Sequence, residues 1–399
     1  MRVIIFLIFF ISASFGDLDF NSKTRNFSVE LFYHTLQGSD RDVAISPYTV
    51  WSLLISLAYE TTGRTWEQFS KVFLLTEDRS KIVEEFRKQR TSVVVNRAMN
   101  VSLTNFLFYD EQLNVHSDGI RRLENDFNFI ATRLNFEAPQ RAADSAFEFM
   151  RSHHEVASNI LRLKEEDFLN ATMVMSNCLS FIAAWSKPFN VSNSSRDYYR
   201  DGNARGSEMM MYVKAQLQFW KSESLHASFT QLPLGDDGRY CMLLVRPDSG
   251  HDVGRVLERL REVSLLDILN KMQEVAVSLG LGEVEVKLPR LAINSRLILN
   301  TPLSNMGLSD VFDQNFADFN NFAEDKIYVG DIAQTVSVYI REYGTIVSTT
   351  TPASPAFIPL EGRTPIKQVP VREPFIFFIM EKSTATVLFG GSYSKINVY

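Results

Sequence analysis

Residues 345–370 constrain the fold of this chain more than any other segment. They contain five prolines, Pro352, Pro355, Pro359, Pro365 and Pro370. Proline lacks the backbone N–H that a helix interior or a central strand requires, so the segment can form neither. Strand-like runs at 336–340 and 375–380 flank it. A long irregular loop inside a compact domain is typical of a functional or a disordered segment, and this one, between two strands, cannot be a dispensable tail.

The remainder of the chain is typical of a soluble globular protein. Of its 399 residues 45% are hydrophobic, and its net charge of −6 does not suit general nucleic-acid binding. The spacing predicts a helix from Phe27 to Leu36 capped by Asn26, a buried helix opened by Ser46-Pro47, and amphipathic helices at 80–90, 118–133 and 142–153. Strand-like runs follow from Ala171 onward. Helices first and strands later predict an α+β fold.

Residues 1–16 have the features of a secretory signal peptide. Arg2 is followed by the apolar run 3–11, and small residues stand at Ser14 and Gly16. We therefore expect a mature chain that begins near Asp17 and is secreted to the extracellular space. The alternative is a buried N-terminal strand or helix. No later run reaches the ~18 apolar residues that would cross a bilayer, so we expect no membrane association.

In a secreted chain, Asn-x-Ser/Thr triplets can be glycosylated and cysteines can form disulfides. Five predicted glycosylation sites are Asn26, Asn100, Asn170, Asn190 and Asn193. The only cysteines are Cys178 and Cys241, both in apolar runs. An extracellular location would permit them to pair, but we expect two buried thiols.

The sequence lacks the signatures of an enzyme. The run from Gly390 to Ser394 fails the last position of a nucleophile elbow, and no phosphate-binding loop is present. His153-His154-Glu155 has no partner at metal-ligand spacing. We predict no catalysis and no metal site.

Several motifs in order resemble the serpin family over essentially the whole mature chain. They are Ser46-Pro47-Tyr48-Thr49; the spaced block Asn177, Phe181, Trp185 and Phe189; Leu288-Pro289-Arg290-Leu291; Leu303 to Phe312; Glu342-Tyr343-Gly344-Thr345; and the closing runs Pro374 to Ile379 and Leu388 to Gly391. The resemblance implies a single domain over residues 17–399 with three β-sheets, about nine helices and an exposed reactive-centre loop at about 345–370. It also implies a monomer without a cofactor.

The resemblance further implies a mechanism and the residues that serve it. A serine protease cleaves the loop, and the freed segment enters the large sheet as a new strand. The hinge of that segment would be Glu342, Gly344 and Thr345. The shutter beneath the sheet would be Ser46, Asn177 and Gln334, with Asn177 and Ser46 buried and bonded to Gln334. The breach at the top would include Trp185 and Arg290, with Arg290 paired to Glu342.

The loop departs from the family pattern in sequence and in length. Counting forward from Glu342 puts the reactive bond at Ile358-Pro359, and counting back from Pro374 puts it at Arg363-Thr364. We favour Arg363, as bait for a trypsin-like protease, because a bond before proline resists most serine proteases. The inserting segment is then five residues too long.

Two hypotheses therefore remain open. The first is a protease inhibitor. The second is a non-inhibitory member that acts as a decoy substrate, carrier or binding protein. The second is favoured by Pro352, which would delete a ladder hydrogen bond, and by bulky Ile346 and Val347 where inhibitors carry alanine. Gln334 also replaces the expected shutter histidine, and it lacks a titratable ring.

Overall fold

The computed structural model describes residues 20–37, 42–94, 100–153, 163–169, 171–201, 204–329, 332–348 and 374–393. Its helices are α1 (Phe20–Leu36), α2 (Pro47–Glu60), α3 (Gly63–Phe73), α4 (Arg79–Val94), α5 (Ser117–Phe127), α6 (Pro139–His153), α7 (Val253–Leu260), α8 (Leu265–Leu279) and α9 (Asn300–Asn305). Its strands are β1 (Val43–Ile45), β2 (Asn100–Asp110), β3 (Phe129–Leu134), β4 (Met173–Ala184), β5 (Ser195–Asp201), β6 (Ala204–Ser222), β7 (Ala227–Leu234), β8 (Tyr240–Pro247), β9 (Gly282–Pro289), β10 (Leu291–Ile298), β11 (Ala333–Arg341), β12 (Gly344–Ser348), β13 (Phe375–Glu381) and β14 (Thr386–Tyr393). The predicted signal peptide and the loop beyond Ser348 lie outside the described residues.

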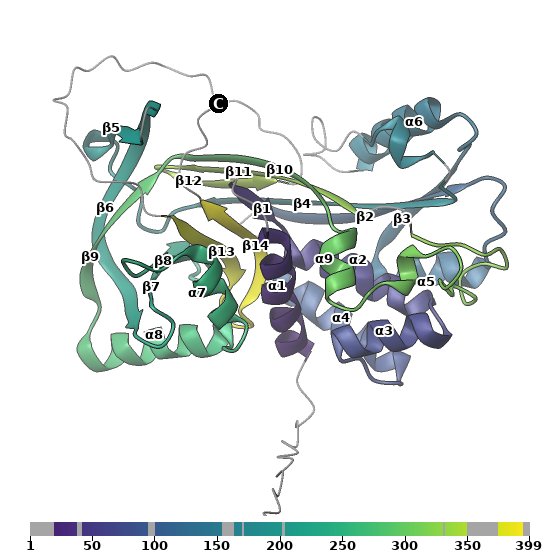
Figure 1. The fold of residues 1–399 in the computed structure, drawn as a ribbon, viewed down its shortest axis with the longest axis horizontal. Helices are drawn as coiled ribbons and strands as arrows, with labels where there is room; N and C mark the ends of the chain where they lie inside the picture. The colour runs from purple at the N-terminus through teal and green to yellow at the C-terminus, as the bar shows by residue number, and fades with distance from the viewer. Residues whose placement is uncertain are drawn as a thin grey trace, which may run out of the picture.

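A six-stranded sheet crosses the molecule in the order β10-β11-β12-β4-β2-β3. In Figure 1, α6 lies above this sheet and α1, α2, α3 and α4 lie below it. The other strands form the path β1-β14-β13-β8-β7-β6-β5, with β9 also paired to β6. The long strand β6 pairs with β5 and β9 in its first part and with β7 in its last part, so two sheets share it. The α+β fold with three sheets agrees with the prediction.

The core lies between the large sheet and the strands near the C-terminus. Every residue of β13 and β14 is buried. Helix α2 is also buried nearly all round, as its apolar sequence predicts, and Pro47 begins it where a missing N–H costs nothing. The rings of Phe181 in β4 and Phe389 in β14 meet with their centroids 6.4 Å apart. The two layers therefore pack directly on each other.

Two of the predicted helix boundaries are wrong. Helix α1 begins at Phe20, so Asn26 lies inside the helix with an exposed side chain and is not its cap. The helix expected over 118–133 ends at Phe127, because Asn128 takes the left-handed backbone conformation at φ 58° that asparagine tolerates. The chain then continues as β3, which pairs in parallel with β2. Tertiary pairing here overrides the helical spacing.

Other features of the described residues bear on the predictions from sequence. Cys241 is a buried free thiol, and burial raises its pKa to about 12. The side chain of Cys178 lies outside the described residues. Within the described part of the chain, no group of three or more His, Cys, Asp or Glu residues could hold a metal ion. No helix there is long and apolar enough to span a membrane.

Candidate functional site

The segment that follows the predicted hinge is a strand in the middle of the six-stranded sheet, so the prediction that 345–370 can form no central strand is wrong for residues 345–348, which precede the first loop proline. Strand β12 pairs antiparallel with β11 on one side and with β4 on the other. Ser348, its last residue, lies opposite Ser337 and Ser180. Among the described residues no strand pairing joins β4 directly to β11. The sheet therefore consists of two halves, β10–β11 and β4–β2–β3, that β12 connects.

The first two residues of β12 fit a narrow space. A Cβ atom at Gly344 would lie 2.3 Å from the carbonyl oxygen of Ala183, so only glycine permits this approach of the two backbones. Thr345 is 1% exposed, and its hydroxyl has no hydrogen-bond partner among the described residues. Hence Gly344 and Thr345 are fully part of the sheet. The side chains of residues 346–348 lie outside the described set.

Glu342, in the turn between β11 and β12, carries the polar contacts of the breach. Arg290 donates from Nε to its two carboxylate oxygens at 2.9 and 3.1 Å and from Nη2 to Oε1 at 2.6 Å. Ser194, which the sequence analysis did not single out, donates to Oε1 at 3.0 Å. Trp185 donates its indole N–H to the carbonyl of Arg341 at 2.8 Å. The predicted Arg290–Glu342 pair is confirmed.

The surroundings of Glu342 keep its carboxylate charged. The residue is 4% exposed, and burial alone would raise its pKa. Hydrogen bonds from Arg290 and Ser194 outweigh burial and hold the pKa of Glu342 below its ordinary value of 4.5. An ionised, fully bonded carboxylate therefore fixes the turn from which β12 starts.

The shutter differs from its prediction at Asn177. Gln334 accepts from the Ser46 N–H at 2.8 Å and donates to the Ser46 carbonyl at 3.0 Å, as expected. Asn177 is only half-buried and donates to the Thr49 carbonyl at 2.7 Å, so both its predicted burial and its predicted bond to Gln334 are wrong. Gln334 also donates to the Thr49 hydroxyl at 2.8 Å. Because β4 and β11 do not pair, each side chain reaches the first turn of α2 separately.

Some of the other predicted site residues lie outside the described residues. The candidate reactive bonds, Arg363-Thr364 and Ile358-Pro359, lie outside the described residues. Of the glycosylation candidates, Asn26, Asn190 and Asn193 are exposed, and the side chains of Asn100 and Asn170 are not described. Asn190 accepts from the Ser192 N–H at 2.9 Å through Oδ1. Its glycosylation stays a prediction.

Comparisons with known proteins cover nearly the whole chain. Residues 22–396 match the family model described as Serpin (serine protease inhibitor). Plasminogen activator inhibitor 1 from Bos taurus is 24% identical over 381 residues, which cover 93% of this chain and 91% of that protein. A solved structure of cleaved Serpin 42Da has a TM-score of 0.76 at 17% identity and covers 95% of this chain and 99% of that one. Thyroxine-binding globulin in complex with thyroxine has a TM-score of 0.72 at 21% identity, covering 93% and 98%.

Proposed function

The chain belongs to the serpin family, and we propose that it is a secreted inhibitor of a trypsin-like serine protease with Arg363 as the bait residue. In the proposed reaction the protease serine attacks the carbonyl carbon of Arg363. The bond to Thr364 breaks, its nitrogen leaves as the new amino terminus, and an ester joins protease and inhibitor. Insertion of the freed segment would then distort the protease before water hydrolyses the ester.

The observation that carries this proposal is β12. A segment that works by entering the sheet must be able to pair on both of its sides, and Gly344–Ser348 does so with β11 and β4. The backbone positions of Ile346 and Val347 lie within this strand, opposite Tyr339 and Val338 of β11. The β-branched residues that replace alanine thus do not prevent pairing.

The register of β12 also limits the effect of the first loop proline. If β12 continued in the same register for four residues beyond Ser348, Pro352 would lie opposite Ser176 of β4 and Ala333 of β11. Ala333 is the first residue of β11. A strand that reached Thr351 would therefore have paired along almost the whole of β11 before a ladder hydrogen bond was lost. This supports productive, though incomplete, insertion.

A second candidate function is a non-inhibitory decoy substrate, carrier or binding protein. The specific observation in its favour is the length of the loop, which at Arg363 exceeds the family spacing by five residues. A slack segment would pull less tightly on the trapped protease. The ester would then be hydrolysed before the protease is distorted, and cleaved protein and active protease would both be released.

Incubation of the mature protein with trypsin tests the proposal. We expect a covalent complex that survives SDS, and Arg363→Ala should abolish it. Lys367→Ala is the matched control, since it removes another basic residue of the same loop and should leave the complex intact. Complete cleavage at Arg363 without any complex would overturn the inhibitor proposal in favour of the second candidate.

A further inference from the structure

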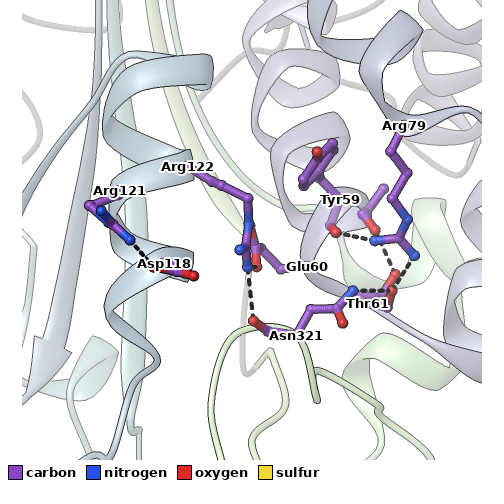
Figure 2. Close-up of polar contacts among 9 residues, drawn as sticks. Tyr59, Glu60, Thr61, Arg79, Asp118, Arg121, Arg122 and Asn321 are labelled. Atoms are coloured by element: carbon purple, nitrogen blue, oxygen red, sulfur yellow. Dashed lines mark hydrogen bonds and ion pairs between the residues drawn. The ribbon is translucent and has the colours of Figure 1, made fainter.

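A third polar cluster joins α5 to the far end of α2. Figure 2 shows Arg122 of α5 between Glu60, the last residue of α2, and Asn321. Arg122 donates from Nε to Glu60 Oε1 at 2.9 Å and from Nη2 to Glu60 Oε2 at 2.6 Å. Nη2 also donates to the Asn321 carbonyl at 2.9 Å. We call these three residues the α5 latch.

The end of α2 that receives the latch is itself firmly held. Arg79 donates to the carbonyls of Tyr59 and Thr61, the latter at 2.8 Å (Figure 2). Its guanidinium lies 4.2 Å from the centroid of the Trp66 ring. Carbonyls at a helix C-terminus lack partners within the helix and attract cations, so Arg79 satisfies them. The carboxylate of Glu60 thus projects from a fixed point.

Helix α5 belongs to one half of the six-stranded sheet. It follows β2 and precedes β3 in the chain, and Asn105 of β2 donates to the carbonyl of Phe127 at its end at 3.1 Å. Any movement of the β4–β2–β3 half therefore carries α5 with it. The connection 313–329 lies against the start of α5, where the His116 N–H donates to the Phe322 carbonyl at 2.8 Å, and it continues toward β11.

Helix α2 contacts both halves of the sheet at its first turn and one of them again at its last residue. At the first turn, Gln334 of β11 bonds to Ser46 and Thr49, and Asn177 of β4 bonds to the Thr49 carbonyl. At its last residue, Glu60 bonds to Arg122, which moves with β2 and β3. Lengthening of β12 beyond Ser348 requires β4 and β11 to move apart. Movement of the β4–β2–β3 half relative to α2 would strain two contacts together, Asn177 with Thr49 and Arg122 with Glu60.

The latch is built to resist such a shift. The Glu60 side chain is 2% exposed and that of Arg122 is 28% exposed, so the pair is shielded from water. Burial raises the pKa of Glu60, and the hydrogen bonds from Arg122 oppose this rise. A carboxylate left in this position without Arg122 would be buried and unpaired, which costs far more than loss of an exposed ion pair.

We propose that Arg122 is a positioning residue that restrains the opening of the six-stranded sheet and so sets how readily β12 lengthens. The inference rests on the proposed function only because loop insertion is the step that needs the sheet to open. Weakening the latch should loosen the facing edges of β4 and β11 before any protease is present.

Amide hydrogen exchange of the intact protein tests this without a protease. Arg122→Gln should speed exchange in 173–184 and 333–348 by about tenfold and leave β13 unchanged. Arg121→Gln is the matched control, because Arg121 is one residue away on α5 and its ion-pair partner in the described part of the chain is the exposed Asp118 (Figure 2). It should leave all these segments at wild-type rates.

Two results would overturn the proposal that the α5 latch restrains the sheet. One is wild-type exchange in β4 and β11 of Arg122→Gln, and the other is an equal increase in β13, which would indicate general destabilisation. If Arg122→Gln does not fold, the double variant Glu60→Gln/Arg122→Gln removes the buried charge while keeping a polar pair of similar volume. Its amide exchange rates in β4, β11 and β13 then test the proposal by the same criteria. The exchange experiment uses no protease, so a protein that forms no complex with trypsin can still show the tenfold effect. Failure of the inhibitor proposal is therefore distinguishable from failure of the latch proposal.

Discussion

Arg290 binds Glu342 through three N–H···O contacts of 2.6 to 3.1 Å, and this pair fixes the turn from which β12 enters the sheet. Arg290 lies between β9 and β10, and Glu342 lies between β11 and β12. The pair thus anchors the start of β12 to the start of β10, which lies on the other side of β11 in the sheet. Below it, β12 separates two halves of the sheet, both of which α2 contacts.

The anchor predicts a specific dependence of stability on pH. Glu342→Gln should lower the free energy of unfolding by about 1–3 kcal/mol at neutral pH, because charge-assisted bonds are lost. The folded pKa of Glu342 lies below its ordinary value, so the wild-type advantage is complete above that value and disappears as pH falls through the folded pKa. Urea unfolding across this range measures it. An equal difference at neutral and strongly acidic pH would contradict the assignment.

Gly344 should be irreplaceable in the inserted strand. Gly344→Ala places a methyl group 2.3 Å from the Ala183 carbonyl oxygen, so β12 must shift away from β4. We expect faster amide exchange across 344–348. Gly282→Ala serves as the control, since a Cβ there would meet nothing within 4 Å. Unchanged protection of β12 in Gly344→Ala would mean that β12 does not pack against β4 in solution.

The shutter predicts a loss of stability when its amide is removed. Gln334→Leu leaves the buried Ser46 N–H without its partner, removes one of the bonds to the Ser46 carbonyl, and should cost roughly 1–3 kcal/mol in urea unfolding. Gln112→Leu changes an exposed glutamine that bonds to Glu137 and should cost little. Equal effects of the two substitutions would show that Gln334 is not a buried structural partner.

The loop prolines should govern the efficiency of inhibition. Replacing Pro352, Pro355 and Pro359 with alanine restores backbone donors to the segment that follows Thr351. We expect a larger fraction of the protein to end as SDS-stable complex with trypsin and a smaller fraction to be cleaved without one. Densitometry of the two products gives this ratio. A ratio identical to that of the wild type would mean that the prolines do not limit insertion.

Much of the fold and half of the shutter were predictable from the sequence because they depend on local patterns and spaced motifs. Buried runs marked β4, β8, β11 and β13, and the Ser46-Pro47 start marked α2. The contacts of Ser46 with Gln334 and of Arg290 with Glu342 were implied by the resemblance that the motifs carry. Ser46 and Arg290 both lie directly after the end of a strand, β1 and β9, within motifs that the sequence contains.

Contacts that depend on the state of the sheet were not predictable. Asn177 does not bond to Gln334, because β4 and β11 do not pair with each other, and no strand pattern in the sequence shows that β12 already lies between them. Thr49 belongs to the motif that begins at Ser46, but the motif does not indicate that its carbonyl accepts from Asn177 and its hydroxyl accepts from Gln334. Glu60 and Arg122 lie 62 residues apart and belong to no motif. Their meeting is a product of tertiary packing.

The melting temperature of the protein before and after cleavage at Arg363 tests the central claim, that the loop enters the sheet, most directly. If the freed segment extends β12 to Thr351, the cleaved protein should melt roughly 5–10 °C higher, at about 2–4 °C for each kcal/mol gained. Calorimetry on intact and trypsin-cleaved samples, with the new amino terminus at Thr364 verified, gives the difference. A cleaved protein that melts at the same temperature as the intact one would contradict insertion.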